Sequence, residues 1–233
     1  MPDALVQLRA LQEQVTACTR CPRLIRYCRK VAQERRRMYR DQEYWGKPVP
    51  SFGDPEAEVL ILGLAPAAHG ANRSGRMFTG DRSGEFLYRA LYEAGFASQP
   101  ESQDRCDGLR LVNCYITAAL RCAPPKNKPL PKELRNCQPY FEAELRLLQR
   151  VRAVLALGKI AFDTFLRVVW KPEIFPLRST FRFAHGASFA LPGGLPRLFA
   201  SYHPSQQNTQ TGRLTRPMFE RVLQDIHRYL AVR

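Results

Sequence analysis

The chain lacks any apolar run long enough to span a bilayer, so the sequence predicts no transmembrane helix. Its first residues also lack the basic and apolar regions of a secretory signal peptide. Seven cysteines are an odd number, and without a secretory signal a framework of disulfides is not expected. These absences exclude the membrane and disulfide-rich secreted classes. We expect a cytoplasmic protein with no membrane partner.

Acidic residues are also scarce, since 21 Asp and Glu against 36 Lys and Arg give a formal net charge of +15. Such an excess favours polyanionic partners, because binding a polyanion releases its condensed counterions. Nucleic acid is the natural candidate. An arginine-rich genome is the alternative explanation, because only seven of the 36 basic residues are lysine. Composition alone leaves both explanations open.

The pattern of apolar residues predicts a three-layer α/β fold. Short apolar runs that are typical of buried strands lie at 59–62, 109–116, 154–157 and 198–200. Helical patterns alternate with them at 83–95, 132–150, 158–169 and 214–230. Strands that alternate with helices form a parallel sheet with helices on both faces. Two further helices are predicted at 3–16 and 23–38, and the length favours one domain over residues 1–233.

A long loop rich in small residues follows the first predicted strand and runs from Gly63 to Asp81. It contains four glycines, which let the backbone approach a ligand closely. The next helix is predicted to begin at a Ser83 N-cap. Because long ordered loops in compact domains are usually functional, this loop is the first candidate for a binding site.

Unusual polar segments also follow the other predicted strands, at 117–129, 158–159 and 201–212. In parallel α/β sheets, ligands bind beyond the carboxyl ends of the strands. The sequence therefore predicts one site, built at a single edge of the sheet from loops that are far apart in the chain.

Three side chains at this edge could carry chemistry. His203 follows the last strand, where an imidazole can donate a hydrogen bond to a leaving group that gains negative charge. A histidine that only supports the structure is the alternative. Asp81 could hold a water or face a developing cation, or it could simply favour the positive end of the following helix. His69 could act directly or support another residue, whereas His185 and His227 lack such a context.

The cysteines fall into two groups. Cys18 and Cys21 form a pair with two residues between them, while Cys122 and Cys137 follow the second strand. Four thiolates without a histidine suit either a tetrahedral zinc ion or an iron–sulfur cluster. The spacing does not choose between them, and we expect Cys28, Cys106 and Cys114 to be ordinary thiols.

The residues from Gly63 to Asp81, with those from Arg121 to Pro129 and from Tyr202 to Ser205, closely resemble the family-5, or type B, uracil-DNA glycosylases. The resemblance covers nearly the whole chain. It implies a central four-stranded parallel sheet between helices. It also implies a [4Fe–4S] cluster with a structural role, held by Cys18, Cys21, Cys122 and Cys137.

The resemblance further implies hydrolysis of the N-glycosidic bond of deaminated bases in DNA, which leaves an abasic site. The target nucleotide must leave the base stack to reach the site. In this reaction His203 would stabilise the departing base anion, and Asp81 is the family-5 candidate for placing water at the sugar. The implied substrates are uracil, hypoxanthine, xanthine and ethenocytosine.

Two departures from related families bear on specificity. Leu64 stands where relatives often carry a polar residue, so no water activator is expected there. Ala118 stands where strict uracil readers have asparagine, and the loss of that amide should relax base discrimination. Asn127 is a candidate for the polar contact to the base that Ala118 cannot make, and it is also a candidate catalytic residue. Phe78 matches the aromatic residue on which the flipped base stacks, with a core phenylalanine as the alternative.

The resemblance thus yields two sets of expected contacts. The base pocket should contain Gly63, Leu64, Ala65, Phe78 and Ala118. Contacts to DNA are expected from Arg73, Arg76, Lys126, Lys128, Ser205, Gln206, Gln207 and Asn208. The residues from Gln206 to Gln210 replace an apolar wedge that some relatives insert into the stack, and the protein is expected to be a monomer.

Two other classes of function remain as alternatives at this point. The first is a non-catalytic DNA-binding module that is stabilised by a four-cysteine metal site. It would bind DNA in a salt-dependent way without releasing a base. The second is an iron–sulfur redox protein that acts on a nucleotide, which the residues from Gly63 to Asp81 disfavour.

Overall fold

A six-stranded sheet forms the centre of the protein in a computed structural model that describes residues 4–175 and 177–232. The spatial order is β1-β3-β2-β4-β6-β5. The four central strands are parallel: β3 (Cys114–Ala118), β2 (Val59–Gly63), β4 (Ala153–Leu157) and β6 (Arg197–Ser201). They confirm the predicted parallel sheet. The antiparallel edge strands β1 (Phe52–Gly53) and β5 (Ser188–Phe189) were not predicted, because two residues are too few to show a periodic pattern.

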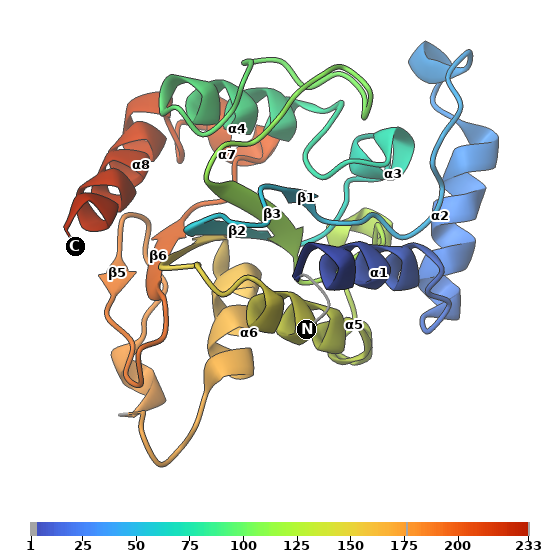
Figure 1. The fold of residues 1–233 in the computed structure, drawn as a ribbon. Helices are drawn as coiled ribbons and strands as arrows, with labels where there is room; N and C mark the ends of the chain where they lie inside the picture. The colour runs from blue at the N-terminus through green and yellow to red at the C-terminus, as the bar shows by residue number, and fades with distance from the viewer. Residues whose placement is uncertain (1–3, 176, 233) are drawn as a thin grey trace.

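Helices cover both faces of this sheet, which confirms the three-layer prediction (Figure 1). One layer contains α4 (Arg82–Glu93) and α8 (Arg216–Ala231), and the other contains α1 (Ala4–Thr16), α5 (Pro131–Leu147) and α6 (Lys159–Val169). At one side of the molecule lie α2 (Pro22–Glu34) and the short α3 (Ala71–Ser74). The remaining elements are α7 (Gln206–Gln210) and three 3-10 turns, η1 (Arg37–Tyr39), η2 (Pro125–Asn127) and η3 (Arg178–Thr180).

Strand β2 shows why the central strands read as continuous apolar runs. Val59 and Ile61 pack into the core on the side of α4 and α8, and Leu60 and Leu62 pack into the core on the side of α5 and α6. All four side chains are fully buried. Because successive side chains of a strand point to opposite faces, a strand covered on both sides needs apolar residues at every position.

The two largest errors in the predicted boundaries each occur next to a residue with positive φ. The predicted strand at 109–116 begins only at Cys114, because Asn113 has φ 51° and its side chain accepts a hydrogen bond from the backbone of Glu58 at 2.7 Å. The predicted helix at 23–38 ends at Glu34, because Arg35 has φ 47°. The first residue of the predicted helix at 3–16 lies outside the described residues.

Within the part of the chain that the structure describes, no helix combines the length and the apolar character needed to cross a membrane.

Candidate active site

The loops that follow the parallel strands meet around a small cavity at the carboxyl edge of the sheet. From the predicted set, Ala65, Phe78, Asp81, Ala118 and His203 line it. Four further residues complete its wall, namely Pro66, Ala67, Met77 and Ser83. Sequence reasoning had marked the loop that contains three of these four without naming them individually. Larger hollows lie elsewhere on the surface, but none of them brings a histidine and an acid together at the strand ends.

Two glycines let the rings and the acid of this cavity pack closely. A Cβ atom on Gly63 would lie 3.0 Å from the Phe78 ring, so the ring rests directly against the end of β2. A Cβ atom on Gly70 would lie 2.0 Å from Oδ2 of Asp81, which no real side chain could tolerate. The glycines predicted to allow close approach therefore make room first for the protein's own Phe78 and Asp81 side chains.

Phe78 and His203 stack on each other inside the cavity, with ring centroids 5.8 Å apart and an interplanar angle of 29°. Phe78 has φ 53°, a left-handed conformation that is strained for a bulky residue. The ring is half-buried and packs against the main core. Phe78 packs against the core, as expected of a core phenylalanine, and it also lines the cavity, as expected of a residue on which a base stacks.

His203 lies between β6 and α7, and its position is fixed by its neighbours. Asn208 donates a hydrogen bond from Nδ2 to the His203 backbone oxygen at 2.8 Å. Burial lowers the pKa of His203 to about 4. The imidazole is therefore neutral at physiological pH, and it can offer one N–H group to an acceptor without carrying a charge.

Asp81 caps a helix and also lines the cavity. Its Oδ1 accepts a hydrogen bond from the Gly84 backbone at 2.9 Å, so Asp81 is the N-cap of α4, which begins at Arg82. The prediction of a Ser83 cap is wrong by two residues. Burial raises the pKa of Asp81, although backbone hydrogen bonds from Gly84 and Ser83 oppose this effect. The acid thus combines a capping role with a place in the wall beside Phe78 and His203.

Four other predicted residues do not line this cavity, namely Gly63, Leu64, Asn127 and His69. Leu64 follows Gly63 and its backbone oxygen accepts a hydrogen bond from Leu120 at 3.0 Å. Asn127 is exposed in η2 with φ 55°. His69 contacts the Tyr44 hydroxyl through Nδ1 at 3.1 Å, and burial together with Arg36 and Arg73 lowers its pKa. The structure thus does not bring Asn127 or His69 to the cavity.

The structure gives Arg73 and Arg76 internal roles in place of the expected DNA contacts. Arg73 is 8% exposed and donates to the backbone oxygens of His69 at 2.8 Å and Gly80 at 2.6 Å, which ties the middle of the loop to its C-terminal end. Arg76 is 4% exposed and binds Asp107 through two hydrogen bonds of 2.8 and 2.6 Å. Their guanidinium groups are occupied inside the protein, so neither is available to a phosphate.

The remaining residues expected to contact DNA lie in two segments, around η2 and on α7. Lys126 and Lys128 are exposed in and after η2, and Gln206 and Gln207 are exposed on α7. Ser205 is the N-cap of α7 and accepts a hydrogen bond from the Asn208 backbone at 3.3 Å. The two lysines and two glutamines are free to meet a ligand, whereas the side chains of Ser205 and Asn208 support the loop that carries His203.

The four cysteines expected to hold metal line a second, narrow cavity, although they come from three separate parts of the chain. Cys18 and Cys21 come from the turn between α1 and α2, Cys122 from the segment after β3, and Cys137 from α5. Two of their sulfurs accept hydrogen bonds, from Asn136 Nδ2 to Cys21 at 3.5 Å and from the Arg121 backbone to Cys137 at 3.3 Å. Cys28 and Cys114 are buried outside this set, and Cys106 is exposed.

The four cysteines share one cavity, and the requirements of a single ion and of a cluster differ. Among the described residues, no three His, Cys, Asp or Glu side chains converge closely enough to hold one metal ion. A zinc ion would draw all four sulfurs to about 2.3 Å from one point. A four-iron cluster instead takes one thiolate at each iron, so its ligands stand around a volume. Burial raises the pKa of Cys137 to about 11, so a thiolate there needs the positive charge of a metal.

The fold and the site define a base-excision enzyme, and the comparison with known proteins agrees. The chain belongs to the Uracil DNA glycosylase superfamily, whose sequence pattern matches residues 50–227. It is 54% identical over 220 residues to the Type-5 uracil-DNA glycosylase of Thermus thermophilus, which covers 94% of this chain and 96% of that protein. The Type-5 uracil-DNA glycosylase of Mycobacterium leprae is 49% identical over 216 residues, with 92% of both chains covered.

These relatives confirm the resemblance to family 5, and the protein is an enzyme, a uracil-DNA glycosylase. A Type-4 uracil-DNA glycosylase from Pyrobaculum aerophilum is more distant, at 26% identity over 70% of this chain and 67% of that protein. The two alternatives, a non-catalytic DNA-binding module and a redox protein, are therefore set aside.

Proposed function

We propose that this uracil-DNA glycosylase also removes hypoxanthine, xanthine and ethenocytosine from DNA, and so acts on a range of damaged bases. The observation that carries the proposal is the cavity wall, where Ala65, Ala67 and Ala118 present only methyl groups. An asparagine amide at position 118 would form hydrogen bonds with one base. With a different base, the amide would be left without partners, and that base would bind less well. A methyl group discriminates weakly between bases.

The proposed mechanism begins with a flipped nucleotide whose base stacks on Phe78. As the bond between the base and C1′ breaks, its electron pair moves onto the base, and the sugar becomes an oxocarbenium-like cation. The neutral His203 donates a hydrogen bond to the base anion, which is worth most in a site that excludes water. Asp81 stabilises the cation and accepts the proton of the water that adds to C1′, a role supported by its place in the same wall.

We further propose that Cys18, Cys21, Cys122 and Cys137 hold a [4Fe–4S] cluster with a structural role. When bound, the cluster would cross-link α1, α2 and α5 to the segment that follows β3. The shared cavity and the absence of any acid or histidine among its four potential ligands support this assignment. The exposed Lys126, Lys128, Gln206 and Gln207 are the proposed contacts to the DNA strand.

Replacing Ala118 by asparagine tests the specificity proposal. The asparagine amide should favour uracil, so the single-turnover rates on hypoxanthine and xanthine should fall about tenfold or more relative to the rate on uracil. The control is Ala119→Asn, one residue beyond the cavity wall. It shows whether an asparagine in this segment lowers the rate on every base by disturbing the structure. Equal losses on every base would contradict the proposed role of Ala118.

A further inference from the structure

A buried ion pair lies beside the cysteine cavity. Arg121 is 1% exposed and Glu144 is fully buried, and the two side chains form a salt bridge. Glu144 also accepts hydrogen bonds from Thr117 at 2.6 Å and from Gln12 at 2.8 Å. Ser51 contacts both members of the pair through its hydroxyl group. Both carboxylate oxygens thus have partners, and the guanidinium group has partners at its two terminal nitrogens.

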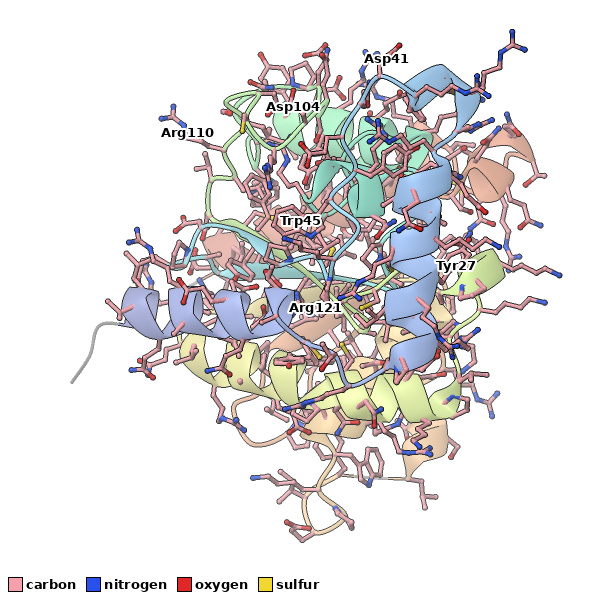
Figure 2. The ribbon with its side chains drawn as sticks, turned by 90° about the vertical axis from the view of Figure 1, so that its right-hand side faces the viewer. Tyr27, Asp41, Trp45, Asp104, Arg110 and Arg121 are labelled. Atoms are coloured by element: carbon pink, nitrogen blue, oxygen red, sulfur yellow. The ribbon has the colours of Figure 1, made fainter. Side chains whose placement is uncertain are left out.

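The third guanidinium nitrogen of Arg121 has none. Its Nε atom is fully buried and makes no hydrogen bond. An unpaired buried donor is costly, particularly on a charged group. The same residue lines the cysteine cavity, directly precedes Cys122, and donates from its backbone to the Cys137 sulfur. In Figure 2, Arg121 lies next to sulfur atoms between α1, α2 and α5.

We propose that Arg121 is a positioning residue for the iron–sulfur cluster. Its free Nε–H donates a hydrogen bond to a sulfur of the cluster or of its cysteine ligands, and its positive charge offsets the negative charge of the cluster. The proposal rests on the cluster proposed above. A salt bridge with a merely structural role would account for Glu144 but would leave the unpaired Nε unexplained.

The position of Arg121 also connects the cluster to the base pocket. Ala118 lines the pocket, and the next two residues bind the end of β2, since Ala119 donates to Gly63 and Leu120 donates to Leu64, both at 3.0 Å. The backbone oxygen of Arg121 accepts a hydrogen bond from Val49 at 2.7 Å. A single short segment therefore runs from the pocket wall to the cluster, and Arg121 fixes its far end.

The test compares Arg121→Gln with Glu144→Gln in the purified full-length protein. The reduced cluster is more negative than the oxidised one, so a nearby positive charge favours reduction. Arg121→Gln should lower the reduction potential, and Glu144→Gln should raise it. Both are measured by redox titration followed by visible absorbance and electron paramagnetic resonance. Arg121→Gln should also lose iron to a chelator about 10-fold faster or more.

Two further variants separate charge from packing. Arg121→Lys keeps the charge without the fixed Nε–H group, so its potential should stay closer to wild type while its iron is lost faster. Arg76→Gln breaks another buried arginine–carboxylate pair, which lies in the first loop, and should change neither the potential nor the iron loss. If Arg121→Gln does not fold, Arg121→Lys decides the question, because iron lost no faster than from wild type would overturn the role of the Nε–H group.

These measurements distinguish two failures, the absence of the cluster and the absence of a role for Arg121. Wild-type protein without iron and sulfide would overturn the cluster itself. Wild-type protein that contains the cluster, with both variants unchanged in potential or changed in the same direction, would overturn only the role of Arg121.

Discussion

At the scale of single residues, the pocket places a neutral histidine and an acid in one wall. His203 is enclosed against Phe78, and burial lowers its pKa to about 4. A charged imidazole would attract the base anion more strongly, but a neutral donor costs less to bury. Asp81 supplies the negative charge on the same wall. In the proposed mechanism, His203 would stabilise the base anion and Asp81 would stabilise the sugar cation.

The two roles of Asp81 can be separated by substitution. Asparagine is as good an N-cap as aspartate, so Asp81→Asn should leave the free energy of unfolding within about 1 kcal/mol of wild type. The same variant should lower the single-turnover rate of uracil release about 100-fold or more, because the charge and the proton acceptor are lost. Asp81→Ala should lose both stability and rate. A fully active Asp81→Asn variant would show that Asp81 only caps the helix.

The pH dependence of base release follows from the same two groups. His203 is already neutral well below pH 6.5, so the rate should show no inflection near the ordinary pKa of histidine. The rate should fall in acid as Asp81 becomes protonated, at a pH above the ordinary aspartate pKa because burial raises its value. Rates measured from pH 4 to 8 check both statements. An inflection near 6.5 that disappears in His203→Ala would contradict the neutral histidine.

The lowered pKa of His203 also makes the free energy of unfolding depend on pH. Between about pH 6.5 and pH 4 the unfolded chain binds a proton at His203 that the folded chain does not. The contribution of His203 to stability is therefore present above the unfolded pKa and is lost as the pH falls through that window. His69 and His185, whose pKa values burial also lowers, act in the same direction.

At the scale of elements, the first loop is held in place by buried arginines. Hydrogen bonds from Arg76 and from backbone groups lower the pKa of Asp107 to about 2, although burial alone would raise it. The pair links the loop to the segment around Ser102, which also accepts a hydrogen bond from Arg76 at 2.8 Å. These bonds attach the loop to the body of the protein at several points.

Arg76→Met tests this internal role. Because it leaves the Asp107 carboxylate partly buried without its partner, the variant should lose about 3 kcal/mol of unfolding free energy at neutral pH. Its affinity for undamaged duplex DNA should stay near wild type once the protein is folded. Urea unfolding and a binding titration measure the two quantities. A large loss of DNA affinity with unchanged stability would restore Arg76 to the DNA surface.

The order of elements was predictable because fully buried strands and amphipathic helices leave clear apolar patterns. The boundary errors occur at Arg35 and Asn113, where positive φ angles interrupt a pattern that reads as continuous. The roles of Arg73 and Arg76 were not predictable, because a loop arginine that binds phosphate and one that binds backbone oxygens look the same in sequence. His203 and Phe78 were found because the strand-end rule and the family motif pointed to the same edge.

At the scale of the whole molecule, the net charge of +15 suits an enzyme whose partner is DNA. Lys126 and Lys128 are exposed, whereas Arg73 and Arg76 of the first loop are buried. The charge excess favours attraction to DNA over the surface. In our proposal, discrimination between bases comes instead from the residues of the pocket.

We infer that one pocket, which has a neutral histidine and several small side chains in its wall, releases several damaged bases. Single-turnover base release from duplexes that carry uracil, hypoxanthine, xanthine or ethenocytosine tests it most directly, with wild type, His203→Ala and the distant control His227→Ala. We predict release of all four bases by wild type and by the control, and a rate about 100-fold to 1,000-fold lower for His203→Ala on each. Release of uracil alone, or undiminished release by His203→Ala, would contradict the account.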